Sequence, residues 1–111
     1  MTVYLDRSRN RFRGMIMCHM ISDDITELFR MARLIGMRSE WFQFQPTSFP
    51  HFDVSTTRRK IAVSNGAVEI DRRVTVGVMR AYRERLLLDP IEKRLHDRLL
   101  NQPSFSFLDR V

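Results

Sequence analysis

The amino-acid sequence predicts an α/β fold: a small, partly parallel sheet with flanking helices and a C-terminal helical extension. Two observations support this prediction. Over the first 73 residues, short apolar segments alternate with helical patterns, as they do where helices connect the strands of one sheet. Beyond residue 73, apolar residues recur mainly at helical spacing. We therefore expect an α/β core over residues 1–73, with the helical extension and tail of residues 74–111 packed on the same single domain.

The N-terminal part of the core predicts two strands separated by a basic loop. Residues 2–5 are a short β-branched and aromatic run that ends at Asp6, and residues 15–21 are apolar enough for a buried strand. Residues 7–14 alternate arginine with polar and aromatic residues. They carry no apolar periodicity, so we expect a loop there.

Residues 23–35 have the pattern of an amphipathic helix. Ser22 or Asp23 is suited to be its N-cap, because a side-chain oxygen there can accept a hydrogen bond from a free backbone N–H. Glu27 is close to the position that completes a capping box. Gly36 stands where a helix commonly ends in the left-handed conformation, so the pattern defines both ends of the helix.

A further strand, loop, helix and strand are expected to follow. Residues 41–44 form a short aromatic run typical of a strand, and the two prolines within residues 45–50 indicate a loop. The next helix has Ser55 or Thr56 as its N-cap. Residues 67–70 are apolar and predict another strand, which continues the alternation of helices and strands.

Two helices are expected in the C-terminal extension. Residues 74–88 have helical periodicity, and Asp89 and Pro90 are suited to the N-cap and the first position of a further helix. The tail at residues 104–108 alternates apolar and polar side chains. It could therefore add to the sheet as an edge strand or dock on a partner.

Composition excludes several classes of protein. The chain has 111 residues, of which 43% are hydrophobic, so it can build a core and general disorder is excluded. Cys18 is the single cysteine, which excludes an intramolecular disulfide and a zinc site built on several thiolates. The sequence contains no apolar run of about 18 residues and no signal peptide, so we expect a cytoplasmic protein with no membrane partner.

The positive charge is carried almost entirely by arginine. The chain has 19 Lys+Arg and 13 Asp+Glu residues, a formal net charge of +6, and Lys60 and Lys93 are its only lysines. Guanidinium groups suit bidentate pairing with phosphate and stacking on aromatic rings. Solvated ion pairs, for example with Asp53 or Glu84, are the alternative use for them. The candidate anion-binding residues are Arg7, Arg9, Arg11, Arg13, Arg58, Arg59 and Lys60.

Two aspartates and two histidines are candidates for a catalytic site. Asp6 ends the first predicted strand, where ligand-binding groups collect in α/β sheets, although it could instead cap a loop. His51 and Asp53 share a face of an extended segment, so the carboxylate could orient the imidazole as a general base or metal ligand. The alternative makes Asp53 an N-cap. His19 lies within an apolar run, where a core histidine is the alternative, and its spacing matches no zinc signature. We therefore predict no metal site and identify no cofactor.

These candidates belong to a pattern that extends over much of the chain. The pattern consists of Met-Thr-Val-Tyr-Leu-Asp at residues 1–6, His-Met-Ile-Ser-Asp at 19–23, Glu27-Leu28, residues 32–36, Phe42-Gln43, His51-Phe52-Asp53, Arg59 and residues 62–67. On these residues, over about residues 1–70, the chain resembles an uncharacterised family of small bacterial and phage proteins with a domain of unknown function. That family usually has tyrosine at position 52 and often histidine at position 29. The resemblance implies a bacterial or phage-infected cell as context and supplies no activity. It emphasises Asp6, His19, His51, Asp53 and Arg59.

Three functions are consistent with the sequence. We expect first a phage- or bacteria-encoded accessory protein that binds a polyanion, nucleic acid or a nucleotide, through an arginine-rich face. The alternative is a small hydrolase-like enzyme for a nucleotide or phosphate ester, with an Asp/His site at the strand ends and Arg59 holding the phosphate. The second alternative is an interaction protein that modulates a host factor, or forms a homodimer, through residues 74–111 with Phe105 and Phe107.

Overall fold

The computed structural model describes residues 2–44 and 49–110. Strand β3 (Met15–Ser22) organises the sheet because it pairs along both edges. β1 (Val3–Leu5) and β2 (Asn10–Phe12) lie antiparallel along one edge, and β4 (Phe52–Ser55) lies antiparallel along the other. β5 (Val68–Glu69) adds to β1 in parallel. The predicted α/β class, with a small and partly parallel sheet, is confirmed.

β1 and β2 are two parts of one hairpin arm, which residues 6–9 interrupt. Both parts pair with the same edge of β3, and the hairpin closes through Arg13 and Gly14, whose φ angles are +51° and +76°. Two consecutive residues with positive φ make the two-residue turn that matches the twist of paired strands. The predicted basic loop over residues 7–14 is therefore wrong in part. All three residues of β2 are exposed, so no apolar alternation marks this strand in the sequence.

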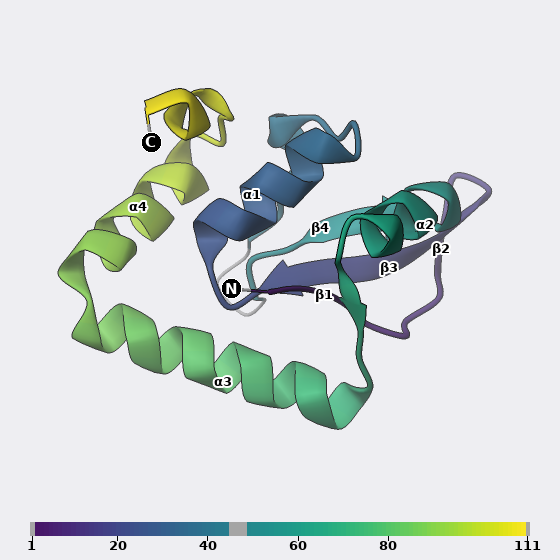
Figure 1. Ribbon diagram of the computed structural model, residues 1–111, viewed down its shortest axis with the longest axis horizontal. Helices are drawn as coiled ribbons and strands as arrows, with labels where there is room; N and C mark the ends of the chain where they lie inside the picture. Colours follow the sequence, from purple (N-terminus) through teal and green to yellow (C-terminus); the bar gives the residue numbers. More distant parts are fainter. Residues whose placement is uncertain (1, 45–48, 111) are drawn as a thin grey trace.

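Two helices begin where strands end. α1 (Ile25–Leu34) follows β3, and Asp24 caps it by accepting a hydrogen bond from the Glu27 backbone N–H at 3.1 Å. The cap lies one residue later than predicted. α2 (Thr56–Ser64) follows β4 directly, with Ser55 as its predicted cap. Both helices lie on the same side of the sheet (Figure 1).

The sheet has one covered face and one that is less covered. Side chains of paired residues lie on the same side, so Cys18 and Met20 of β3 share a face with Val54 and Phe52 of β4. All four are buried beneath the helices. The alternate residues project from the opposite face, and His19 is among them. The register of β3 and β4 thus places His19 and Asp53 together on the face opposite the core that Met20 and Phe52 form.

The C-terminal helices pack on the same core. α3 (Arg72–Leu88) lies on the side of the sheet opposite α1 and α2, and α4 (Pro90–Asn101) returns toward α1 (Figure 1). They bury Tyr82 and Leu99, and the Tyr82 hydroxyl lies 2.9 Å from Nδ1 of His96. Both predicted C-terminal helices are present. None of the helices among the described residues is long and apolar enough to cross a membrane.

The predicted edge strand in the tail is wrong. The tail ends in a short 3-10 helix, η2 (Ser106–Arg110). The rings of Phe105 and Phe107 lie 6.0 and 5.6 Å from the ring of Phe29 in α1. The alternation of the tail therefore reflects packing of its phenylalanines on a helix, which needs no strand.

The predicted strand over residues 41–44 is also wrong. The chain there forms the 3-10 helix η1 (Ser39–Trp41), and the backbone after it pairs with the segment before β4 through an isolated bridge between Gln43 and His51. Most of the predicted loop over residues 45–50 lies outside the described residues. The edge strand is β4 itself, which the sequence placed in an extended segment before the second helix.

Candidate metal centre and its surroundings

Two histidines converge on one oxygen of Asp53. The register pairs His19 with Asp53, and His51 lies two residues before Asp53, so all three side chains project from the less covered face. Nε2 of His19 lies 3.8 Å from Oδ1 of Asp53, and Nε2 of His51 lies 3.5 Å from the same oxygen. The two imidazole rings meet edge to face with centroids 5.0 Å apart. The sequence predicts these residues to be part of one Asp/His site at the strand ends, and the pairing of β3 with β4 brings them together on one face of the sheet.

Both histidines are held through their other ring nitrogen. Nδ1 of His51 lies 2.6 Å from the carbonyl oxygen of Phe49, and Nδ1 of His19 lies 2.6 Å from Oδ2 of Asp6. A carbonyl oxygen can only accept, so Nδ1 of His51 carries a proton, and Nε2 is the ring nitrogen that faces Asp53. The same geometry at His19 directs its Nε2 to Asp53 as well. Gln43 fixes the third group, donating to Oδ2 of Asp53 at 2.7 Å.

Asp6 lies at the point where the hairpin arm leaves the ladder, and its carboxylate accepts several hydrogen bonds. Its Oδ1 accepts from the backbone N–H of His19 at 2.9 Å, and from the N–H and hydroxyl of Ser8 at 3.1 and 2.6 Å. Burial alone would raise the pKa of Asp6, but the hydrogen bonds from His19 and Ser8 outweigh it and hold this pKa well below its usual range. The hydrogen bond to Asp6 raises the pKa of His19, against the opposing effect of burial. Asp6 is therefore an anionic group that positions His19.

In the metal-free protein, replacing Asp6 by asparagine is expected to lower the pKa of His19 toward its ordinary value of 6.5. The elevated pKa stabilises the wild-type fold fully below about pH 6.5, and this contribution is lost as the pH rises through the folded-state pKa. The difference in free energy of unfolding between the wild type and Asp6→Asn should therefore decrease as the pH rises from about 6.5 through the folded-state pKa of His19. An NMR titration of the histidine ring protons in EDTA measures the pKa directly. His96, whose pKa burial lowers, is the internal control and should not change. An identical His19 titration in both proteins would contradict the prediction.

The converging atoms suit a divalent first-row metal ion. The ligand atoms of His19, His51 and Asp53 all lie within 4.8 Å of one another. Bond lengths of about 2.0–2.1 Å in a tetrahedral site place ligand atoms about 3.3 Å apart, close to the Nε2–Oδ1 distances here. Two imidazole nitrogens and one carboxylate oxygen are ligands for zinc, manganese and iron. Three protein ligands also leave a position for water, which is typical of catalytic sites.

The fold explains why the pattern in the sequence did not predict this centre. The spacing of His19 alone predicted no metal site, since His19 and Asp53 are far apart along the chain and meet only through β-pairing. Position 29, where the resembled family often has histidine, does not belong to the centre. Phe29 is fully buried and packs at 4.9 and 5.3 Å on the rings of Phe42 and Phe52, on the covered face of the sheet. Phenylalanine at position 29 therefore does not affect the three candidate ligands, His19, His51 and Asp53.

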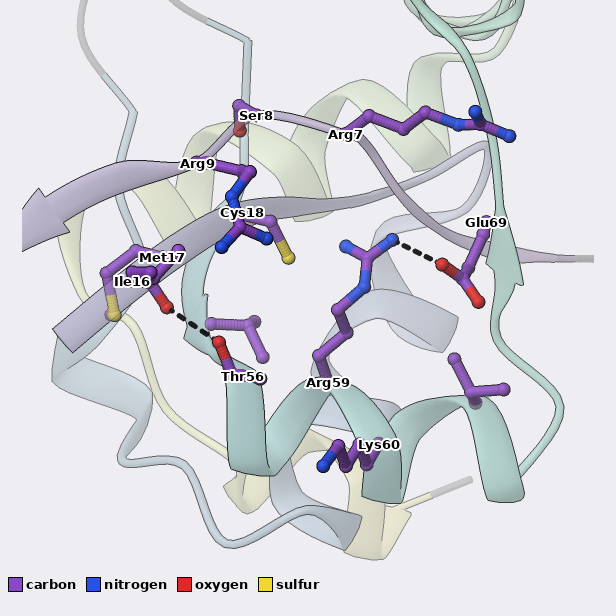
Figure 2. A pocket seen from close by; sticks show the side chains of 12 residues that line it. Arg7, Ser8, Arg9, Ile16, Met17, Cys18, Thr56, Arg59, Lys60 and Glu69 are labelled. Carbon is purple, nitrogen blue, oxygen red and sulfur yellow. Dashed lines mark hydrogen bonds and ion pairs between the residues drawn. The ribbon is translucent and has the colours of Figure 1, made fainter.

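Four of the candidate anion-binding residues line a cleft on the covered side of the sheet, between α2 and the hairpin arm. This α2-side cleft has a volume of about 720 Å³. Figure 2 shows Arg9 and Arg59 extending toward its middle beside the sulfur of Cys18, while Arg7 points away. Burial raises the pKa of the Cys18 thiol, although Arg59 opposes this effect. The residues of the cleft that carry positive charge are Arg7, Arg9, Arg59 and Lys60.

Arg59 is held by the fold and does not face the two histidines. Its guanidinium donates to the carbonyl oxygen of Asp6 at 2.7 Å. It also donates to Glu69 at 2.7 Å, as Figure 2 shows. Asp6 thus presents its carboxylate to His19 on one side of the sheet and its carbonyl to Arg59 on the other. The structure brings the four Asp/His candidates together and leaves Arg59 outside that group.

A second cleft reaches the candidate metal centre at Asp53. This aromatic groove has a volume of about 740 Å³ and includes Asp53 and Gln43 in its lining. Arg13 and Arg58 line it, whereas Arg11, exposed on β2, lines neither cleft. Its other main lining residues are Phe12, Met15, Met17, Met37 and Trp41. Sequence reasoning did not single out Ser8, Gln43 or Trp41. Gln43 could have been found, since it belongs to the pattern shared with the family.

Comparison with known proteins gives a family and no activity. Residues 3–82 match the model of a family described as "Protein of unknown function (DUF4031)". No curated protein and no solved structure matches the chain. The match continues past residue 70, where the resemblance in the sequence ended, and reaches Tyr82 in α3. The bacterial or phage origin implied by that resemblance stays a prediction.

Proposed function

The chain belongs to the DUF4031 family, whose function is unknown, and from the geometry of its site we propose that it is a metal-dependent hydrolase of phosphate esters. One observation carries this proposal: the Nε2 atoms of two histidines and one carboxylate oxygen of Asp53 converge. A hydrogen bond at Nδ1 orients each histidine ring, and a hydrogen bond at Oδ2 orients the carboxylate. Such orientation is characteristic of metal ligands, because it fixes the tautomer that leaves Nε2 free to bind. A cluster of polar side chains on an ordinary surface does not require all three groups to be oriented in this way.

The chemistry follows from the ligand set. A divalent ion bound by His19, His51 and Asp53 would lower the pKa of a coordinated water to about 7, which supplies hydroxide near neutral pH. Such a hydroxide would be suited to hydrolysis of a phosphate ester, in which a P–O bond to the hydroxide oxygen forms, the P–O bond to the alcohol breaks, and the departing alcohol takes up the proton. Arg13 and Arg58 line the groove that begins at Asp53, so an anionic ester is the substrate class that the charge favours.

The decisive experiment measures hydrolysis after the metal content has been controlled. Protein treated with EDTA and then supplied with Mn²⁺, Zn²⁺ or Mg²⁺ is assayed on bis(p-nitrophenyl) phosphate and on a short oligonucleotide. We expect hydrolysis with at least one of these ions and none in EDTA. The rate should fall at least about 100-fold in His51→Ala, whereas Lys60→Ala, on the far side of the sheet, should keep the wild-type rate. A protein that binds none of the ions, or that hydrolyses neither substrate when loaded, would refute the proposal.

The second candidate is polyanion binding without catalysis, and the α2-side cleft favours it. Arg9 and Lys60 line that cleft beside Arg59, and none of its lining residues belongs to the three metal ligands. Binding there would be independent of metal and would weaken steeply with salt. Oligonucleotide binding in EDTA that is lost in Arg9→Ala would support this function. No observation favours the alternative of an interaction protein for a host factor, because Phe105 and Phe107 pack on Phe29 within the chain.

A further inference from the structure

The aromatic groove combines exposed rings with arginines beside the candidate metal centre. Phe12 is 54% exposed and Trp41 is 43% exposed, although large aromatic side chains are normally buried. They come from different elements, β2 and η1, and line the same groove. Met15, which is 43% exposed, lines the same groove. Exposed apolar side chains gathered at one cleft mark a surface that binds something.

Each exposed ring is paired with a guanidinium group. Arg13 lies over the ring of Phe12, with its central carbon 5.1 Å from the ring centroid. Arg58 lies over the ring of Trp41 at 5.4 Å. An arginine over an aromatic ring is attracted by the face of the ring and still presents N–H donors to an anion. The groove therefore offers two sites of the same composition, each with a flat stacking surface and a cation.

The remaining charges of the groove favour an anionic occupant. Among the residues that line it, the carboxylates are Glu40 and Asp53. Glu40 is already neutralised by Arg38, which donates to it at 3.0 and 2.7 Å, and Asp53 faces the two histidines. An apolar or basic peptide bound in the groove would supply no counter-ion to Arg13 and Arg58. Stacking surfaces with cations at their edges are typical of sites for unpaired bases and their phosphates.

We propose that a single-stranded nucleic acid lies in the aromatic groove, with bases stacked on Phe12 and Trp41 and phosphates paired with Arg13 and Arg58. A duplex would not fit this chemistry, because its bases are stacked on one another and their faces are hidden. Since Asp53 is part of both the groove and the candidate centre, a strand bound in this way brings a phosphodiester to the metal ligands. The delivery step rests on the proposed function, whereas stacking in the groove does not require a metal.

The test measures strand binding without catalysis. The fluorescence anisotropy of a labelled single-stranded DNA of 12 nucleotides, about the site size of such proteins, is titrated in EDTA and compared with the matched duplex. We expect the single strand to bind more tightly, with an affinity that falls as salt rises. Trp41→Ala and Phe12→Ala should each weaken binding about tenfold. Trp41 is the chain's single tryptophan, so its fluorescence should also be quenched as the strand stacks on it.

Matched variants make each outcome decisive. Leu87→Ala removes a side chain on α3 that is 84% exposed and should leave binding unchanged, and circular dichroism verifies the fold of every variant. Equal affinity for the duplex, or full affinity in both aromatic variants, would overturn the proposal. Loss in Arg9→Ala alone would move the binding site to the α2-side cleft and overturn it as well. Strand binding by a protein that binds no metal would support the site in the aromatic groove and refute the proposed hydrolase. The failure of one proposal can therefore be distinguished from the failure of the other.

Discussion

Replacing Asp53 by asparagine is expected to lower the affinity of the protein for Mn²⁺ and Zn²⁺ by at least about 100-fold. Asparagine has nearly the same shape, and its carbonyl oxygen can accept the hydrogen bond that Gln43 donates to Asp53. What it lacks is the negative charge on the one oxygen that both histidines face. Even residues that only orient a metal ligand typically change affinity about 10- to 100-fold, so loss of a charged ligand should cost at least the upper value. Isothermal titration calorimetry of the EDTA-treated protein measures the change.

Glu40→Gln is the matched control for this substitution. Glu40 is a carboxylate in the same groove, but it pairs with Arg38 and lies outside the three metal ligands. Its removal should leave metal affinity unchanged. A second readout is stability, because an ion that binds only the folded state raises the unfolding temperature. Mn²⁺ or Zn²⁺ should stabilise the wild type and Glu40→Gln and leave Asp53→Asn unaffected. Wild-type affinity in Asp53→Asn would show that the metal binds elsewhere.

The residues of the site could be predicted from the sequence, but a metal site and the strand pairing that brings the residues together could not. The alternation of His51 and Asp53 indicated that they share a face, and the end of the first strand drew attention to Asp6. Neither observation says which strand lies beside which. The candidate ligands come together because β4 pairs with β3 in a register that places Asp53 opposite His19. A shift of one residue would turn Asp53 into the core and Phe52 out to solvent, so burial of Phe52 and Val54 is what fixes this register.

One strand was missed and another was predicted where none forms, and the two errors have different physical causes. β2 is exposed along its whole length, so its residues carry no apolar alternation, and the two-residue turn at Arg13 and Gly14 lacks the usual Asn-Gly or Asp-Gly signal. Residues 41–44 have the aromatic content of a strand. Their aromatic side chains serve two other purposes: Phe42 is buried on Phe29 and Phe52, and Trp41 lines the groove. Aromatic content alone cannot distinguish a strand from a segment that supplies one ring to the core and another to a surface site.

Replacing Phe29 by alanine is expected to lower the free energy of unfolding by about 4 kcal/mol. The side chain is fully buried, and its ring packs on four others, at 4.9 Å from Phe42, 5.3 Å from Phe52, 6.0 Å from Phe105 and 5.6 Å from Phe107. These rings come from the segment after η1, from β4 and from the tail, so no single neighbour can move in to fill the cavity. For a domain stabilised by about 5–15 kcal/mol, this loss is a large share of the total.

Urea unfolding followed by circular dichroism measures the loss, with Leu34→Ala as the control on the same helix. Leu34 is 58% exposed, so its removal should change stability by less than about 0.5 kcal/mol. Equal losses in the two variants would contradict the central role of Phe29. Phe52 connects this packing to the candidate centre, since it precedes Asp53 in β4 and holds the strand in register. Metal affinity in Phe29→Ala should therefore fall only as far as the folded fraction falls, and full affinity should return where the variant is fully folded.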